Sequence, residues 1–213
     1  MAALPTYIVL LATLSVAAML FADQRAPQLE WLFKPLASLC FVALALQAGA
    51  LESTYGLLLL SGLILCLFGD VLLIPANDNT FIAGLSSFLL GHLLFALAFL
   101  QLPPKQSAML ISLLPVAALG IISLRWLWPH LPPNMKAPVC AYVAVICAML
   151  IAASSSWGTG PGAWIILGAW GFAISDLSVA RNQFFSPRFS NRLWGIPLYF
   201  GSQLLLAWSV SLT

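Results

Sequence analysis

Charge is scarce in this chain of 213 residues. Only 7% of them are Asp, Glu, Lys or Arg, against about 25% in soluble globular domains, while 62% are hydrophobic. This composition excludes a soluble globular domain. The net charge of +2, from eight basic and six acidic residues, is too small to form a basic nucleic-acid-binding surface. We therefore expect membrane lipids, and no nucleic acid, as partners.

Metal-binding patterns are also lacking. The four cysteines lie within apolar runs and form no C-x-x-C pair, so neither a disulfide framework nor a zinc site is indicated; they are Cys40, Cys66, Cys140 and Cys147. We interpret them as small buried hydrophobic residues. The two histidines, His92 and His130, lie in different segments. We expect no metal and no cofactor.

Long apolar runs separated by short polar or proline-rich segments occupy most of the chain. About 20 residues of helix cross a bilayer core of about 30 Å, so the runs predict an all-α integral membrane protein with eight transmembrane helices in one bundle. The expected spans are 4–22, 31–50, 54–74, 81–102, 108–128, 138–155, 161–180 and 193–212. The loops leave no room for a soluble domain, so residues 1–213 are expected to form one polytopic domain.

The first run, from Leu4, is interpreted as a span and not as a signal peptide. No basic segment precedes it, and it has no convincing cleavage site. The odd-numbered connections contain most of the basic residues, whereas the even-numbered ones contain only Lys105; the former are Arg25, Lys34, Lys136, Arg181, Arg188 and Arg192. Because cytoplasmic loops retain Lys and Arg, this multi-pass protein is expected to place both termini outside the cytoplasm, in the cell membrane if the host is bacterial.

A weak internal similarity relates the two halves of the chain. Aligning Gly62 with Gly168 also aligns Asp70 with Asp176. Two halves of four spans each would run parallel and would bring both aspartates to the same membrane face. Chance matching between two apolar segments is the alternative.

Asp70 and Asp176 are the acids placed within expected spans. A carboxylate there costs about 2.5–3.5 kcal/mol on insertion scales, so each requires a reason. One interpretation is an acid near a helix end that reaches water or pairs with an arginine such as Arg181. The other is a carboxyl pair in a water-accessible cavity, with one group acting as an acid and the other as a base.

His92 lies well inside the fourth expected span, on a stripe that it shares with Phe81, Phe88, Phe95 and Phe99. These rings either line an acyl-chain pocket or face lipid while the imidazole turns inward. His92 itself is either a structural or a catalytic residue. An adjacent stripe of small residues, which includes Gly84 and Gly91, indicates close helix packing.

Four further polar residues are candidates for a site. Tyr199 and Gln203 are four residues apart and share a helix face, and Tyr142 begins the sixth expected span. Each of these either bonds to a neighbouring helix or belongs to a site. Lys34 precedes Pro35, which we place in the first turn of the second span, so its ammonium is expected at the depth of lipid phosphates. A simple interfacial anchor is the alternative for Lys34.

Several short motifs, in their order along the chain, resemble those of the YhhN-like membrane proteins, a family that includes the lysoplasmalogenases. The motifs are Lys34-Pro35, Gly69-Asp70-Val71-Leu72-Leu73, the run from Phe81 to His92, Tyr142 to Met149, Ser175-Asp176-Leu177 with Ala180, and Tyr199 to Gln203. The resemblance covers nearly the whole chain. Phe95 stands where the family often has tyrosine, so that hydroxyl is not expected to be essential.

The resemblance implies an ether hydrolase that cleaves the vinyl ether of a lysoplasmalogen, with a lysophospholipid as substrate and fatty aldehyde as a product. It assigns catalysis to Asp70 and Asp176. His92, Tyr142, Tyr199 and Gln203 are candidates for supporting the carboxyls or a water molecule, and Lys34 for binding the phosphate. A proton-coupled transporter and a non-catalytic lipid-binding scaffold are the competing classes, because paired intramembrane acids also suit a proton relay.

Overall fold

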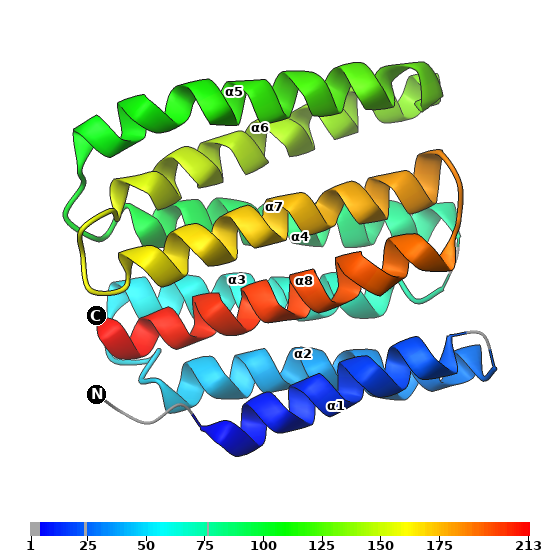
Figure 1. Cartoon of the computed structure of the whole chain (residues 1–213), viewed down its shortest axis with the longest axis horizontal. Helices are drawn as coiled ribbons and strands as arrows, with labels where there is room; N and C mark the ends of the chain where they lie inside the picture. The colour runs from blue at the N-terminus through cyan, green and yellow to red at the C-terminus, as the bar shows by residue number, and fades with distance from the viewer. Residues whose placement is uncertain (1–4, 24, 76) are drawn as a thin grey trace.

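The computed structural model describes residues 5–23, 25–75 and 77–213, and in these ranges the chain forms eight α-helices (Figure 1). They are α1 Thr6–Ala22, α2 Glu30–Gln47, α3 Thr54–Leu72, α4 Asp78–Phe99, α5 Gln106–Leu127, α6 Pro133–Ser155, α7 Gly162–Phe184 and α8 Phe189–Ser209. Short 3-10 helices cover Pro27–Leu29, Trp128–His130 and Val210–Leu212. The expected all-α bundle is confirmed. Leu4, the expected start of the first span, lies outside the described residues.

The helices lie side by side along one common direction (Figure 1). Helices α1 and α2 lie at one edge and α5 and α6 at the opposite edge, with α3, α4, α7 and α8 between them. The connections that follow α1, α3, α5 and α7 all lie at the end of the bundle opposite to the C-terminus (Figure 1). This end is called the basic end below, because the expected cytoplasmic loops with most of the Lys and Arg lie here.

The outer surface of the bundle is apolar, as expected of a protein surrounded by lipid. Leu114 is 80% exposed and Ile111 76% exposed, both on α5. Seven of the described helices are long and apolar enough to cross a membrane, while α1 is apolar but shorter, with 17 residues. The chain is therefore an integral, multi-pass membrane protein.

Helix ends differ from the expected spans where polar residues continue a helix beyond its apolar part. Helix α6 begins at Pro133, not at 138, and α7 continues to Phe184, not to 180. Helix α2 begins at Glu30, so Pro35 lies inside the helix and the prediction that it occupies the first turn is wrong.

Small residues allow α3 and α4 to approach closely, which confirms the expected packing stripe on α4. A Cβ atom added to Gly62 would lie 2.5 Å from the Phe95 ring, and one added to Gly91 would lie 3.1 Å from the Cys66 sulfur. In the second half, a Cβ atom on Gly168 of α7 would lie 2.8 Å from Leu206 of α8. These close contacts set the positions of α3 and α7, the two helices with the intramembrane aspartates.

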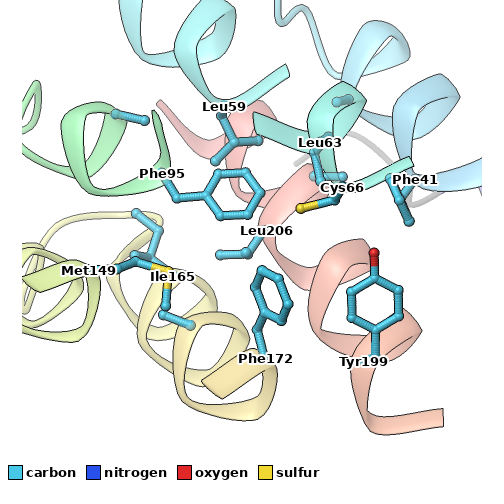
Figure 2. Close-up of a cluster of buried hydrophobic side chains, with 14 of the residues drawn as sticks. Phe41, Leu59, Leu63, Cys66, Phe95, Met149, Ile165, Phe172, Tyr199 and Leu206 are labelled. Atoms are coloured by element: carbon cyan, nitrogen blue, oxygen red, sulfur yellow. The ribbon is translucent and has the colours of Figure 1, made fainter. Parts of the chain in front are cut away.

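Large apolar side chains from α3, α4, α7 and α8 fill the middle of the bundle (Figure 2). Phe95, Phe172 and Leu206 are each completely buried. The Phe172 ring packs with its centre 5.4 Å from that of Tyr199, at the edge of this cluster (Figure 2). The core therefore holds Tyr199, a candidate site residue, in a defined position.

Candidate active site

Asp70 lies near the end of α3, where α2 and α8 pack against it. The residue is 2% exposed. Its Oδ2 atom accepts hydrogen bonds from the Ser38 hydroxyl of α2 at 2.6 Å and the Tyr199 hydroxyl of α8 at 2.8 Å. Two donors from different helices thus hold one carboxyl group. This burial does not fit the interpretation of Asp70 as a helix-end acid that reaches bulk water.

Asp176 lies about two turns before the end of α7. Its Oδ2 atom accepts a hydrogen bond from the Tyr142 hydroxyl of α6 at 3.0 Å and lies 3.4 Å from Nε2 of His92 of α4. Among the described residues, no ion pair joins Asp176 to Arg181. The neighbours of Asp176 are therefore a phenol and an imidazole.

His92 is completely buried, and its two ring nitrogens face two oxygen atoms. Nδ1 lies 2.7 Å from the carbonyl oxygen of Phe88, which can only accept, so Nδ1 must carry a hydrogen and donate it. In a neutral imidazole Nε2 then has a lone pair; this atom lies 3.4 Å from the Asp176 carboxyl oxygen and has no hydrogen-bond partner among the described residues. Two acceptors cannot bond to each other, so a hydrogen bond between these two atoms would require one further proton, on the carboxyl group or on the ring.

A mostly apolar cavity joins the two aspartates. Its lining includes Lys34, Asp70, Tyr142, Asp176 and Tyr199, together with apolar side chains from α4 to α8. Among the latter are Leu85, Phe88, Leu119, Val143, Ile146 and Ala173. We call this space the apolar cavity. Its walls suit a hydrocarbon chain, and among the described residues that line it the only acids are Asp70 and Asp176.

A second cavity adjoins the first at the basic end of the bundle. Its lining includes Glu30, Lys34, Asp78, Asn182, Gln183 and Arg192, which lie where α2, α4 and α8 begin and α7 ends. We call this space the polar cavity. Lys34, Leu73 and Phe81 line both cavities, so the two spaces share a wall.

Comparison with known proteins identifies the family of this chain. Residues 29–210 match the sequence profile of the YhhN family. The chain belongs to the YhhN family. No solved structure matches it.

Three relatives show how similar other proteins are to this chain in sequence. A lysoplasmalogenase of Mycobacterium tuberculosis is 33% identical over 148 residues, 66% of this chain and 54% of the relative. Lysoplasmalogenase TMEM86B of Sus scrofa is 34% identical over 179 residues, 83% of this chain and 72% of the relative. The membrane protein YhhN of Escherichia coli O157:H7 is 31% identical over 149 residues, 67% of each chain. This chain spans about half the length of the mycobacterial relative.

Within this YhhN-family fold, five of the seven expected site residues line the apolar cavity. His92 does not line it but lies 3.4 Å from one of the five, Asp176. Gln203 does not join them. It is completely buried beside the Cys66 thiol, and its amide oxygen and nitrogen have no hydrogen-bond partner in the described part of the chain. Gln203 thus bonds to neither aspartate.

The phenylalanine stripe of α4 divides between core and cavity. Phe88, Phe95 and Phe99 are buried, so the interpretation in which these rings face lipid is wrong. Phe81 and Phe88 line the apolar cavity, whereas Phe95 packs in the core (Figure 2). The acyl-pocket interpretation therefore fits only the half of the stripe nearer the basic end.

Ser38 is the site residue that sequence reasoning missed. Its hydroxyl makes the shorter of the two hydrogen bonds to Asp70. The available signal was its position four residues after Lys34, which places both on one face of α2. A serine in an apolar helix usually bonds to its own backbone, so that signal was weak.

Proposed function

We propose that this chain hydrolyses the vinyl ether bond of 1-alkenyl lysophospholipids, releasing a fatty aldehyde and glycerophospho-ethanolamine or glycerophosphocholine. One observation carries the proposal: two carboxyl groups with different partners, Asp70 buried and Asp176 partly buried, line a single apolar cavity. The names of the mycobacterial and porcine relatives, both lysoplasmalogenases, agree with this reaction class.

The reaction requires an acid and a base. A vinyl ether is cleaved when its β-carbon is protonated, which produces an oxocarbenium ion at the carbon that bears oxygen. Water then attacks that carbon, and the resulting hemiacetal separates into aldehyde and alcohol. Enzymes that cleave glycosides through a similar cation use a pair of carboxyl groups, one protonated and one ionised.

Asp176 is the general acid in this proposal. A proton on the Asp176 carboxyl group is available for transfer, and His92 Nε2, which lies 3.4 Å away and has no other partner among the described residues, is placed to accept a hydrogen bond from it. Asp176 lines the cavity, whereas His92 does not, so His92 acts through Asp176 as a positioning residue.

Asp70 is the ionised partner. The Tyr199 hydroxyl donates to it, and the single Ser38 hydrogen, within reach of Asp70 at 2.6 Å and of the Lys34 carbonyl oxygen at 3.0 Å, donates over the shorter distance to Asp70; a carboxylate without a further proton satisfies this arrangement. Its negative charge would stabilise the oxocarbenium ion, and its free oxygen would accept a proton from the attacking water.

The protons balance over one turnover. Asp176 gives its proton to the β-carbon, and water transfers one proton to Asp70 as its oxygen bonds to the cation. Asp70 then protonates the departing glycerol oxygen, while the hemiacetal hydroxyl returns its proton to Asp176. One water is consumed, and both aspartates regain their starting states.

The test is release of fatty aldehyde from a 1-alkenyl lysophospholipid by the purified protein in detergent. The saturated 1-alkyl analogue has no alkene to protonate and should give no product. We expect aldehyde from the alkenyl lipid only. A folded, monodisperse sample that releases none would reject the proposal, and pH-gradient-driven uptake of lipid or solute into proteoliposomes would then favour the transporter.

A further inference from the structure

The polar cavity contains charged side chains that the proposed chemistry does not use. Glu30, Asp78, Lys34 and Arg192 all line it, two acids and two bases. A cavity with both positive and negative side chains, next to the apolar cavity at the basic end of the bundle, suits a ligand that also carries both charges.

The position of the polar cavity determines which part of a bound lipid would reach it. Lys34 lines both cavities, and the apolar cavity also contains Asp70 and Asp176. A substrate whose vinyl ether lies at the aspartates and whose hydrocarbon chain occupies the apolar cavity would extend its polar end past Lys34. The phosphate follows the glycerol directly, so it is the first charged group to meet this lysine.

The two cations differ in how fully they are engaged. Arg192 Nε lies 2.8 Å from Asp23, and its terminal nitrogen lies 2.8 Å from Glu30. Lys34 Nζ lies 3.5 Å from Glu30, longer than the roughly 2.7–2.9 Å of a strong charge-assisted hydrogen bond. Lys34 therefore keeps hydrogen-bonding capacity for an anion, while Arg192 and Glu30 hold the start of α8 against α2.

Asp78 is the acid without a cation. Its side chain is exposed at the first residue of α4, lines the polar cavity and forms no ion pair within the described ranges of the chain. The dipole of α4 favours a negative charge there but does not neutralise it. A ligand ammonium group at this carboxylate would complete the charge pairing of the cavity.

We infer that the polar cavity binds the zwitterionic headgroup of the lysophospholipid, with the phosphate at Lys34 and the ammonium at Asp78. The inference rests on the proposed function, because it takes the position of the vinyl ether from it. The bound lipid then has one orientation: its chain lies in the apolar cavity and its headgroup at the basic end. The glycerophospho product leaves from that end.

The experiment compares three substrates with the same alkenyl chain. They are the 1-alkenyl glycerophosphoethanolamine, the 1-alkenyl glycerophosphate, which lacks the ammonium, and 1-alkenylglycerol, which lacks phosphate as well. We expect wild-type kcat/KM to fall about tenfold at each step, as is typical when a charged partner is left unpaired. Glu52→Gln, an exposed acid in the connection between α2 and α3, is the matched control and should preserve both ratios.

Each of two variants should abolish one of these two differences in kcat/KM between substrates. Asp78→Asn should bring the ratio of kcat/KM for the ethanolamine and phosphate substrates close to one. Lys34→Gln should bring the ratio for the phosphate and glycerol substrates close to one. A wild-type ratio retained in Asp78→Asn would overturn the ammonium assignment, and one retained in Lys34→Gln would overturn the phosphate assignment.

Failure of the proposed function would be recognised separately. Hydrolysis of 1-alkenylglycerol reports the vinyl ether reaction without a headgroup. If none of the three substrates is hydrolysed, the Kd values of the saturated 1-alkyl glycerophosphoethanolamine and 1-alkyl glycerophosphate, measured by calorimetry in detergent, test the headgroup site alone. Tighter binding of the ethanolamine lipid that is lost in Asp78→Asn would support the site, and equal wild-type affinities would reject it.

Discussion

Asp70 and Asp176 are the same residue type, each in the half of its helix nearer the basic end, yet their surroundings differ. Asp70 of α3 accepts two hydrogen bonds, from Ser38 of α2 and Tyr199 of α8. Asp176 of α7 accepts one, from Tyr142 of α6, and faces the acceptor nitrogen of His92 of α4.

The proposed mechanism uses this difference to give the two carboxyl groups opposite tasks. A carboxylate with two hydroxyl donors is complete as an anion, whereas a carboxyl group opposite a lone pair can bond to it only when a further proton is present. The distinction comes entirely from neighbouring helices, because α3 and α7 contribute the same residue at the same end. The predictions below test this asymmetry.

The largest effect is expected from removing either carboxylate. Asp70→Asn and Asp176→Asn should each reduce aldehyde release by about a thousandfold or more, since general acid or base catalysis typically contributes about 10²- to 10⁴-fold. Turnover is measured on protein that elutes as a monodisperse peak, with Glu52→Gln as the matched exposed control. Near-normal turnover in either folded variant would remove that aspartate from the mechanism.

An intermediate effect is expected at His92, which touches Asp176 but does not line the cavity. His92→Phe keeps the ring stacked on Phe172 but removes the acceptor for the Asp176 proton, so kcat should fall about a hundredfold while KM changes less than about twofold. His92→Gln offers an amide oxygen as acceptor and should recover at least about tenfold.

A merely structural role for His92 would produce another pattern. Both variants would then lose folded protein in proportion to their activity, and the activity per folded molecule would be unchanged. The fraction of protein in the monodisperse peak provides this correction. An increase in KM equal to the loss in kcat/KM would instead place His92 in substrate binding.

The smallest effects should separate the two tyrosines. Hydrogen bonds to charged groups contribute about 1.5–3 kcal/mol and those between neutral groups about 1 kcal/mol. Tyr199→Phe, which removes a donor from ionised Asp70, should therefore lower kcat/KM about tenfold or more. Tyr142→Phe, beside protonated Asp176, should lower it only about fivefold. The reverse order would contradict the assignment of acid and base.

Much of the site could be predicted from the sequence because charge is so rare within the spans. Asp70 and Asp176 are conspicuous as acids in apolar runs, and the family motifs added Lys34, Tyr142 and Tyr199; all five line the apolar cavity. Gln203 was selected because it shares a helix face with Tyr199. One turn along α8 was enough to move it from the cavity into the core beside Cys66.

The sequence by itself determined that this chain crosses a membrane as helices, because only helical segments satisfy their own backbone hydrogen bonds in lipid and because each apolar run has the length of one crossing. It also identified the two acids, Asp70 and Asp176, whose position within membrane spans requires an explanation. The tertiary structure decided what surrounds each acid. Ser38 and Asp70 are 32 positions apart, and Tyr199 and Asp70 are 129 apart. Such contacts depend on how each helix is rotated against its neighbours, which the packing of small and large side chains over the whole bundle determines.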